Sequence, residues 1–178
     1  MSGSAAILNR ATLYIFSGLP GSGKTTLARL LAGRVGAAYL RIDTIEQALR
    51  DLCSFDVEGE GYRLAYRVAA EMLTLGVSVA ADSCNPVELT RREWEQVAAN
   101  AGARYVNIEV VCSDVVEHRK RVETRASTVP GLRLPTWQEV ESREYDDWTI
   151  DRIVLDTSKR LEHECIEDLL SKLSAWKA

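Results

Sequence analysis

The sequence has few cysteines and histidines, and they show no metal-binding or disulfide pattern. Its 178 residues include four cysteines, Cys53, Cys84, Cys112 and Cys165, and no two of them are spaced as in a CxxC motif. Only two histidines are available to complete a ligand set. A structural zinc site or a disulfide framework is therefore not expected, and scattered thiols of this kind are typical of a cytoplasmic protein.

The sequence also lacks an excess of positive charge and any long hydrophobic run. The 22 Lys and Arg residues are outnumbered by 26 Asp and Glu residues, which gives a formal net charge of −4. Nucleic acids and anionic membranes favour basic proteins, so neither partner is expected. Residues 1–8 have no basic segment followed by a long apolar run, and no apolar run matches a membrane span. We therefore expect neither a signal peptide nor a transmembrane segment.

The composition is that of a globular domain, with 46% hydrophobic and 27% charged residues. The length suits a single domain over residues 1–178. Strand-like and helix-like hydrophobic patterns alternate along the chain, which predicts a parallel sheet covered by helices. Strands are expected at 11–17, 38–42, 77–81, 105–111 and 152–155, and helices at 27–35, 44–52, 62–75, 85–101, 114–125 and 161–176.

Local signals predict where several of these helices begin. Thr44 and Gln47 have the spacing of a capping box, and so do Thr136 and Glu139. Asn85 precedes a proline, as an N-cap residue precedes proline at the first helical position. In the 62–75 helix, the spacing predicts a buried face formed by Leu64, Ala65, Val68, Met72 and Leu75.

The strongest chemical signal is a glycine-rich segment between the first expected strand and the first expected helix. Residues 18–26 match the pattern G-x-x-x-x-G-K-[ST]. Glycines allow backbone N–H groups to curl around a phosphate, and the following helix adds its dipole. Lys24 would contact the β- and γ-phosphates, and the Thr25 hydroxyl would bind Mg²⁺. An ordinary glycine-rich turn is the alternative. The expected nucleotide-binding residues are Gly18, Leu19, Pro20, Gly21, Ser22, Gly23, Lys24, Thr25 and Thr26.

Residues 18–28, Gly-Leu-Pro-Gly-Ser-Gly-Lys-Thr-Thr-Leu-Ala, resemble the P-loop kinases of the nucleotide-kinase-like group. The resemblance is to AAA-type P-loop ATPases and small hydroxyl kinases such as chloramphenicol phosphotransferase, gluconate kinase, polynucleotide kinase and zeta toxins. In element order it extends over nearly the whole chain. It implies a three-layer αβα P-loop NTPase fold whose five-stranded parallel sheet has the order 2-3-1-4-5. It also implies ATP and Mg²⁺ as cofactors and an arginine-bearing lid at about residues 119–135.

Asp43 is the candidate catalytic base. It follows the second expected strand, so we expect it at the carboxyl edge of the sheet, where ligands bind in open α/β folds. A carboxylate there can orient a substrate hydroxyl and accept its proton. The resemblance to hydroxyl kinases implies the same role, because those enzymes have an aspartate at about this position. The alternative is a helix cap, although Thr44 has the better spacing for that role.

Asp82 follows the third expected strand, as the acidic residue of a Walker B motif does. If that strand neighbours the first, the Asp82 carboxylate can hold a water of the Mg²⁺ shell. The alternative is a turn-forming aspartate. Ser83, Cys84 and Asn85 are expected at the same edge of the sheet.

Residues 118–133 contain five Lys or Arg and one Glu, a local charge of +4 in an acidic chain. Arg121 and Arg125 are four residues apart and are expected on one helix face. Guanidinium groups there would stabilise the charge on the transferring phosphoryl group, and we assign Arg121 and Arg125 that role. Arg119 is expected to pack near the adenine. Ion pairing on a solvated helix face is the alternative for all three.

Two further segments are candidates for ligand contacts. The resemblance implies that Thr157 and Ser158, after the fifth expected strand, lie beside the adenine, although Ser158 also suits a helix N-cap. Substrate contacts are expected from residues 44–66 and from the lid. Tyr62 and Tyr66 would stack on an aromatic acceptor or pack in the core.

These residues predict an ATP- and Mg²⁺-dependent kinase that transfers the γ-phosphoryl group to a hydroxyl of a small molecule. A nucleoside monophosphate kinase is one alternative, but its phosphate acceptor needs additional arginines. Segment 44–70 offers only Arg50, Arg63 and Arg67. A polynucleotide kinase is disfavoured by the negative net charge. A regulatory ATPase that acts through a partner is the alternative from another class.

Overall fold

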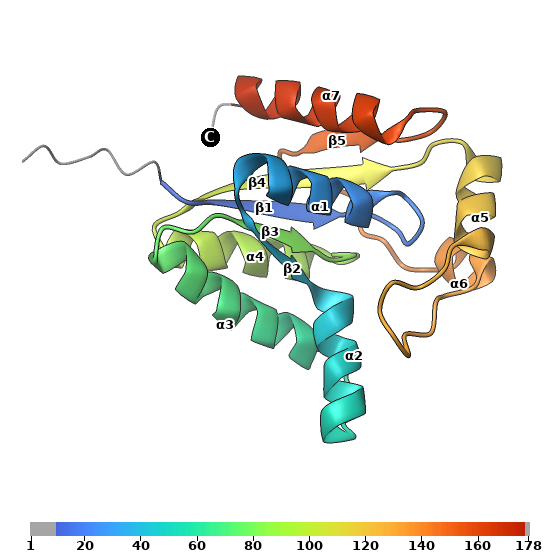
Figure 1. Ribbon diagram of the computed structural model, residues 1–178, viewed down its shortest axis with the longest axis horizontal. Coiled ribbons are helices and arrows are strands. Elements are labelled where there is room, and N and C mark those ends of the chain that lie inside the picture. The colour runs from blue at the N-terminus through green and yellow to red at the C-terminus, as the bar shows by residue number, and fades with distance from the viewer. Residues whose placement is uncertain (1–9, 177–178) are drawn as a thin grey trace, which may run out of the picture.

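The computed structural model describes residues 10–176, which form a five-stranded sheet with helices on both faces (Figure 1). All strands are parallel and lie in the order β2-β3-β1-β4-β5, which confirms the predicted fold class and strand order. The strands are β1 (Thr12–Ser17), β2 (Ala38–Arg41), β3 (Val79–Asp82), β4 (Arg104–Val111) and β5 (Ile153–Asp156). The helices are α1 (Lys24–Val35), α2 (Ile42–Cys53), α3 (Glu60–Thr74), α4 (Glu88–Asn100), α5 (Val115–Thr124), α6 (Trp137–Glu141) and α7 (Glu162–Ala175).

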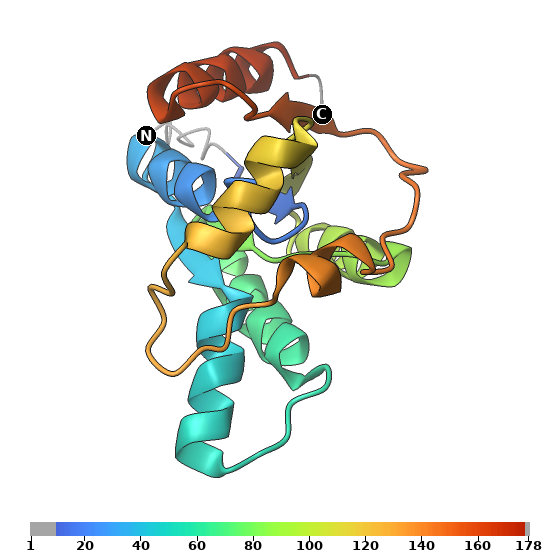
Figure 2. The same ribbon diagram turned by 90° about the vertical axis from the view of Figure 1, so that its right-hand side faces the viewer.

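The helices divide into two covering layers and a group at the carboxyl edge of the sheet. Helices α1 and α7 cover one face, and α3 and α4 cover the other (Figure 1). Helices α5 and α6 lie beyond the carboxyl ends of the strands, on the side that Figure 2 turns toward the viewer. This arrangement leaves the loop between β1 and α1 at the centre of that edge, with polar segments around it.

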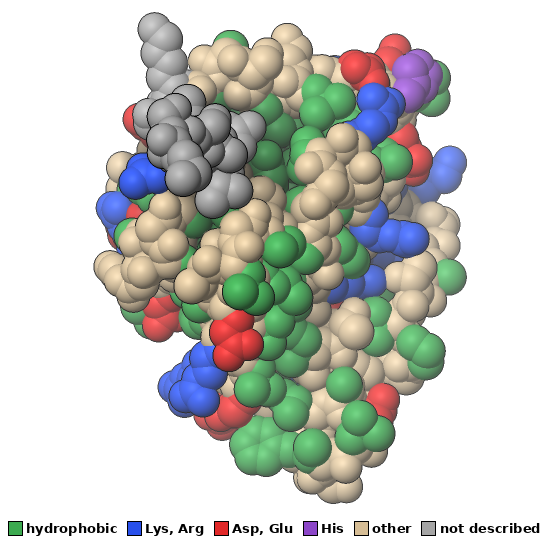
Figure 3. Space-filling view, turned by 60° about the vertical axis from the view of Figure 1, so that its left-hand side comes forward, with side chains coloured by type: hydrophobic (Ala, Val, Ile, Leu, Met, Phe, Trp, Pro, Cys, Tyr) green, Lys and Arg blue, Asp and Glu red, His purple; other side chains and the backbone are tan. Residues whose placement is uncertain are grey.

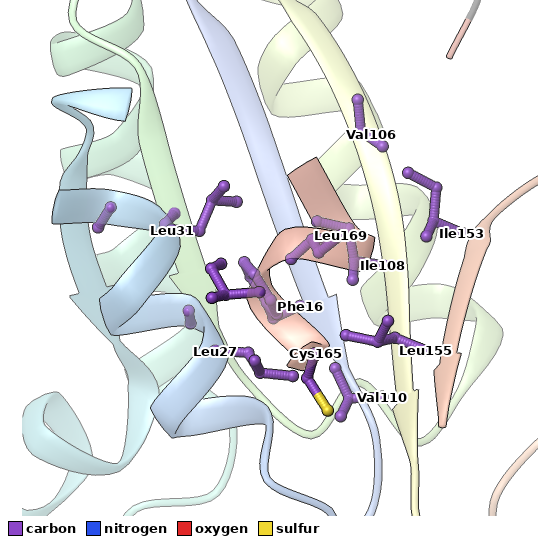
Figure 4. Close-up of a cluster of buried hydrophobic side chains, with 14 residues drawn as sticks. Phe16, Leu27, Leu31, Val106, Ile108, Val110, Ile153, Leu155, Cys165 and Leu169 are labelled. Atoms are coloured by element: carbon purple, nitrogen blue, oxygen red, sulfur yellow. The ribbon is translucent and has the colours of Figure 1, made fainter. Parts of the chain in front are cut away.

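The central strand β1 contributes buried side chains to both layers. Phe16 packs with side chains of α1, β4, β5 and α7, including Leu27 and Leu169 (Figure 4). Leu13 and Ile15 face the opposite layer, and neither they nor Phe16 is exposed to solvent. Each such burial contributes about 1.5–3 kcal/mol, so the strand that leads into the glycine-rich loop is held firmly.

Strand β2 ends one residue earlier than predicted, and this changes the position of Asp43. Ile42 is already the first residue of α2 and is 3% exposed, because it packs under α3 and α4 as part of the core. Arg41 is the N-cap residue, so the prediction that Thr44 caps this helix is wrong. Asp43 therefore lies in the first turn of α2 and not at the end of a strand, where its charge suits the helix dipole.

The prediction that Asn85 caps a helix is also wrong, because α4 begins three residues later with Val87 as its N-cap. Asn85 is instead fully buried in a left-handed conformation with φ 46°. Its side-chain amide donates to the carbonyl of Phe16 and to the hydroxyl of Ser17, at 3.1 and 3.0 Å. It thereby joins the turn after β3 to the end of β1.

The predicted buried face of α3 is correct for Ala65, which is buried, and for Met72, which packs against the core, and wrong for its other members. The buried residues are Gly61, Ala65, Ala69 and Leu73, whereas Leu64, Val68 and Leu75 are exposed. Small residues four apart let α3 approach its neighbours closely, and a Cβ on Gly61 would lie 2.3 Å from Cγ of Glu46 in α2. The large apolar residues were the misleading signal, because close helix packing here uses small ones.

The aromatic residues of α3 lie in the core. The rings of Tyr62 and Tyr66 meet edge to face with centroids 6.0 Å apart, and Tyr66 meets Trp94 in the same way at 4.6 Å. This geometry agrees with the packing interpretation of Tyr62 and Tyr66 and not with stacking on an acceptor.

The sequence predicts no disulfide, no structural metal site and no transmembrane segment, and the structure can be compared with these predictions over residues 10–176. The four cysteines are free there, and Cys112 and Cys165 are buried. In this described part no helix is both long and apolar enough to cross a bilayer, and no cluster of three His, Cys, Asp or Glu side chains could hold a metal ion. On the face shown in Figure 3, Lys and Arg side chains are interspersed with acidic and apolar ones. The prediction about a signal peptide at residues 1–8 lies outside the described residues.

Candidate active site

The glycine-rich loop between β1 and α1 has a conformation that requires its glycines. Gly18, Gly21 and Gly23 have φ values of 141°, 86° and 95°, in a region that side-chain-bearing residues rarely adopt. A Cβ on Gly18 would lie 2.2 Å from the carbonyl oxygen of Val110, and one on Gly21 would lie 2.5 Å from Cγ2 of Val122. Gly23 caps α1 without a side-chain hydrogen bond. The first N–H groups of α1 therefore lack a capping side chain and are suited to an anion.

Hydrogen bonds from neighbouring elements hold this loop in place. Nε2 of His118 donates to the carbonyl of Pro20 at 2.9 Å, and the hydroxyl of Thr157 donates to the carbonyl of Ser22 at 2.8 Å. The N–H of Gly18 donates to the carbonyl of Cys84 at 3.1 Å. Because these contacts come from α5, the loop after β5 and the loop after β3, three separate segments fix the phosphate cradle before any ligand binds.

The loop opens into a cavity of about 240 Å³ that we call the phosphate cavity. Its lining includes four cationic side chains and no carboxylate. Such a lining attracts a polyphosphate even though the whole chain is acidic. The lining residues are Gly21, Gly23, Lys24, Thr25, Thr26, Arg41, Arg121, Arg125, Ala126, Ser127, Thr128 and Leu134.

The two lid arginines predicted to act on phosphate both line this cavity, but in different ways. Arg121 donates to the hydroxyl and the carbonyl of Thr157 at 2.8 and 2.9 Å, and it pairs with Glu117 at 2.5 Å. Arg125 is the first residue after α5, so the two do not share a helix face. Nε of Arg125 is buried without a hydrogen-bond partner within residues 10–176. Burial lowers the pKa of Arg125, while Asp43 acts in the opposite direction.

Arg119 and Ser158, which we expected near the adenine, do not line the phosphate cavity. Arg119 pairs with Glu123 at 2.8 Å on the exposed face of α5, as the surface alternative predicted. The prediction that Ser158 caps a helix is wrong, because the N-cap of α7 is Leu161. The Ser158 backbone instead donates to Asp156. Although partial burial acts to raise it, hydrogen bonds from Ser113 and Ser158 hold the pKa of Asp156 well below its usual range.

A second cavity, of about 250 Å³, lies beside the glycine-rich loop on the α7 side. Arg121 lines both this cavity and the phosphate cavity, so the two adjoin, and Thr157 also lines the second one. Gly23 approaches Thr157 closely, since a Cβ there would lie 3.4 Å from Cγ2 of Thr157. The remaining lining residues are Thr26, Leu27, Arg160, Glu162 and Cys165.

On its other side the phosphate cavity continues into a cavity of about 520 Å³, which we call the acceptor cavity. Lys24, Thr25, Arg41, Arg125 and Leu134 line both spaces. The further lining residues are Pro20, Asp43, Glu46, Gln47, Arg50, Asp82, Ser83, Cys84, Gly131, Leu132, Arg133, Pro135 and Arg143.

Asp43 lies at the acceptor cavity with its side chain 49% exposed. Oδ2 of Asp43 accepts hydrogen bonds from Nη2 and Nε of Arg41, at 2.9 and 3.2 Å. Oδ1 has no partner within residues 10–176. The arginine therefore orients the carboxylate and leaves one oxygen available to a ligand.

Asp82 is the last residue of β3, and its residue is 3% exposed. Its Oδ2 accepts from the hydroxyl of Tyr39 at 2.7 Å and lies 3.9 Å from Nε of Arg41. Burial and then the charge of Asp82 raise the pKa of Tyr39. Since β3 pairs with β1 with Asp82 opposite Phe16, this carboxylate lies beside the strand that leads to the loop, as the Walker B interpretation requires.

The residues present fit a magnesium ion bound together with a nucleotide. Mg²⁺ prefers oxygen ligands and keeps several waters, so it needs no cluster of three protein ligands. Thr25 and Asp82 both line the acceptor cavity, and Thr25 also lines the phosphate cavity. The hydroxyl of Ser22 is buried in the loop and has no hydrogen-bond partner among the described residues. It is a further polar group that suits a bound anion.

The lid covers α2 and the glycine-rich loop. Nη1 of Arg41 donates to the hydroxyl of Thr128 at 2.9 Å, and a Cβ on Gly131 would lie 3.2 Å from Nε2 of Gln47. The predicted capping box of Thr136 and Glu139 is present and starts α6. At the base of the lid, Val122, Trp137 and Val140 form a buried cluster against Leu19.

Three side chains of the acceptor cavity were not predicted. Arg41 lies two residues before Asp43, and its position near the end of the strand predicted at 38–42 was an available signal. Glu46 lies one turn after Asp43, and burial raises its pKa despite nearby Arg50. Arg143 lies beyond α6, where no sequence signal points to a site.

A glycine-rich loop that starts a helix at the carboxyl edge of a parallel sheet of order 2-3-1-4-5, beside a buried aspartate at the end of β3, defines a P-loop nucleotide-binding domain of the nucleotide-kinase-like group. Similarity in sequence identifies the family of this domain. The chain belongs to the AAA domain family, whose model matches residues 13–141. No curated protein matches the chain in sequence.

Solved structures share this fold over nearly the whole chain. The chain is similar to the APS kinase of Mycobacterium tuberculosis bound to AMPPNP and APS, with a TM-score of 0.70, 20% identity, and coverage of 93% of this chain and 98% of that one. A gluconokinase from Sinorhizobium meliloti has a TM-score of 0.66 and 15% identity, with 93% of each chain covered. Kti12 of Chaetomium thermophilum bound to ADP-AlF3 has a TM-score of 0.64 and 21% identity, with 89% of this chain and 97% of that one covered.

Proposed function

We propose that this protein transfers the γ-phosphoryl group of ATP to a hydroxyl group of a small molecule. The observation that carries the proposal is the direct continuity of the phosphate cavity with the acceptor cavity. Lys24, Thr25, Arg41 and Arg125 line both of them, so a phosphoryl group held by the loop faces an acceptor in the second space. The kinases among the similar structures support the same reaction class.

The nucleotide would lie along the loop with its phosphates in the phosphate cavity. Loop N–H groups and Lys24 bind the β- and γ-phosphates. The base then occupies the cavity on the α7 side, between Thr26 and Arg160. In this arrangement the Thr157 hydroxyl donates to the carbonyl of Ser22 in the loop, and Thr157 also lines the cavity that would hold the base.

Mg²⁺ would be held by the Thr25 hydroxyl and, through water, by Asp82, and it would neutralise charge on the β- and γ-phosphates. Tyr39 and Arg41 fix the Asp82 carboxylate in place, since one donates to it and the other lies 3.9 Å away. Both of these contacts to the Asp82 carboxylate therefore come from residues of β2.

The acceptor hydroxyl would bind to Oδ1 of Asp43, the oxygen that Arg41 leaves available. As the hydroxyl oxygen forms its bond to phosphorus, the bond from phosphorus to the ADP oxygen breaks and the hydroxyl proton passes to Asp43. Charge on the transferring group is stabilised by Lys24 and Arg125, and Arg121 supports the same wall of the cavity.

A regulatory ATPase is the second candidate, favoured by the similarity to Kti12 bound to ADP-AlF3. The requirement for an acceptor separates the two functions. A kinase forms ADP rapidly only when an acceptor is present, whereas a regulatory ATPase hydrolyses ATP without one.

To test the proposal, ADP formation is measured with and without a protein-free metabolite extract, and labelled products are identified by mass. We expect the extract to raise the initial rate by at least about 100-fold, the lower end of what a positioned acid–base group contributes. A product carrying one additional phosphoryl group should appear at the same rate as ADP. Equal rates with and without extract, and no phosphorylated product, would contradict the proposal.

A further inference from the structure

The acceptor cavity carries more positive than negative charge, and part of this excess lies away from the glycine-rich loop. Its lining contains six cationic side chains and three carboxylates. Three of the cationic residues do not line the phosphate cavity and come from three segments: Arg50 from α2, Arg133 from the lid and Arg143 from the chain after α6. The acceptor would therefore meet guanidinium groups that the phosphates of ATP do not occupy.

Most arginines of this cavity already have carboxylate partners. Arg41 lies 2.9 Å from Asp43, Arg50 lies 3.5 Å from Glu46, and Arg133 lies 2.7 Å from a glutamate of α6. Arg125 lines the phosphate cavity, where the transferring group lies.

Among the described residues, Arg143 differs from the three paired arginines because it has no carboxylate partner, and from Arg125 because it does not line the phosphate cavity. Within residues 10–176 no carboxylate lies within 4.0 Å of its guanidinium, and its one recorded polar contact is with Sγ of Cys84, at 3.9 Å. A thiol is a weak acceptor and does not balance a full charge. Within the described residues this guanidinium therefore has no ion pair, and the nearest charge effect is on Glu46, whose pKa Arg143 acts to lower against the larger effect of burial.

Arg143 and Asp43 lie where one small ligand can reach both. These two residues, together with Glu46 and Cys84, line the acceptor cavity and also an adjoining cavity of about 360 Å³. The two spaces have the volumes typical of small-molecule sites. A ligand whose hydroxyl contacts Asp43 therefore has its remaining groups within the space that Arg143 borders.

We propose that the acceptor carries an oxyanion in addition to its hydroxyl, and that Arg143 binds this group. The proposal rests on the proposed kinase function and names the substrate class of the same site. A guanidinium matches the geometry of a carboxylate, sulfate or phosphate, and it can donate two parallel hydrogen bonds to any of them. A neutral acceptor would leave Arg143 without a partner, and Asp43 and Glu46 restrict the anion to the arginine side of the cavity.

The kinetic test compares acceptors that differ only in the charged group. Suitable pairs are glycerate and glycerol, an aldonic acid and the matching alditol, and a nucleoside 5′-monophosphate and its nucleoside. We expect at least one anionic member to be phosphorylated with a kcat/KM at least about 10-fold above that of its neutral partner. Neutral members that are used as well as the anionic ones would overturn the proposal.

The variant Arg143→Gln then tests the residue itself. We expect the KM for the anionic acceptor to rise by about 10- to 100-fold, the effect of losing a hydrogen bond to a charged group, with the KM for ATP unchanged. Arg143→Lys should recover part of the loss. Arg34→Gln is the matched control, because this exposed arginine of α1 pairs with Glu167 of α7 and lines none of the four cavities. An unchanged acceptor KM in Arg143→Gln would assign the anion to another residue and overturn the proposal.

A second readout needs no turnover and separates this proposal from the proposed function. Cys84 borders the acceptor cavity, whereas Cys53 is exposed at the end of α2 and lines neither acceptor space. Alkylation of both thiols by iodoacetamide is followed by mass spectrometry in the presence of ADP and Mg²⁺. Glycerate, or sulfate at equal ionic strength with chloride, should slow the modification of Cys84 and not that of Cys53.

For each variant, the rate of Cys84 modification with the anion is divided by the rate without it. The comparison is made within one variant because removing a neighbouring guanidinium changes the reactivity of the thiol itself. Protection in the unmodified protein that is lost in Arg143→Gln supports the anion site, even if no acceptor is phosphorylated and the proposed function fails. Rapid phosphorylation of neutral acceptors without protection supports the kinase and overturns the anion site. If the anions neither protect Cys84 nor serve as acceptors, the anion site is also overturned.

Discussion

Lys24→Ala should lower kcat/KM for ATP by about 100- to 1000-fold, the loss expected when one group that stabilises transition-state charge is removed. Lys24 is the first residue of α1 and lines both the phosphate cavity and the acceptor cavity. Within residues 10–176 no carboxylate lies within 4.0 Å of it, so its charge is not neutralised by the protein. The measurement is steady-state kinetics at saturating acceptor, with nucleotide affinity determined separately by calorimetry.

The fold should survive this change, because alanine is favoured in a helix and Lys24 makes no recorded side-chain contact within the described part of the chain. Lys172→Ala is the matched control. That lysine lies on α7, pairs with Asp168 at 3.1 Å and lines neither cavity. Both variants should have the unfolding temperature of the original protein within a few degrees. Nucleotide affinity and turnover that remain normal in Lys24→Ala would refute the assignment of the loop.

Asp43→Asn should reduce kcat by about 100-fold or more and leave the affinity for ADP unchanged within about twofold. Asparagine keeps the size of the side chain and an oxygen that can accept from Arg41, so the local structure is expected to persist. It cannot take the proton of the acceptor hydroxyl. Single-turnover kinetics with ATP and acceptor measure the chemical step directly.

Glu46 provides the decisive comparison for this assignment. It lines the same cavity, and burial raises its pKa above the ordinary value of a glutamate. If Asp43 is the base, Glu46→Gln should lower the rate of the chemical step by no more than about 10-fold. This is less than the loss expected when a group that acts as an acid or base is removed. Asp147→Asn, at an exposed residue that lines neither cavity, controls for the loss of one charge. A large loss in Glu46→Gln with normal rates in Asp43→Asn would reverse the roles.

The fold and the loop were predictable because their signals are local in sequence. Alternating apolar segments indicated a parallel sheet, and residues 18–26 contain a complete phosphate-binding motif. The glycines at 18, 21 and 23 all have positive φ in the structure, so the pattern of residue types and the backbone conformation agree. The capping box at Thr136 is local in the same sense, and the structure confirms it.

The element boundaries failed where tertiary contacts outweighed local preference. Ile42 has a strand-like side chain, yet it begins α2 because this places it in the core beneath α3. Asn85 matches a helix cap, yet its side chain is used to bond Phe16 and Ser17 across the sheet edge. Both departures lie next to the candidate site, where departures from local preference are expected.

The acceptor side of the site was the least predictable part. Arg41, Glu46 and Arg143 come from different segments and meet only after the sheet edge, α2 and the chain beyond α6 have packed together. No spacing along the chain relates Arg143 to Asp43. Sequence alone therefore predicted the phosphate-binding loop and not the charge of the acceptor cavity.

The central claim of this account is that the backbone of residues 18–25 binds the phosphates of a nucleotide. A crystal structure with AMPPNP and Mg²⁺ tests it most directly. We expect the β-phosphate within hydrogen-bonding distance of the loop N–H groups, Nζ of Lys24 beside the β- and γ-phosphates, and the γ-phosphate facing Asp43. An analogue bound elsewhere, or a loop occupied by solvent while Lys24 points away from it, would contradict the account.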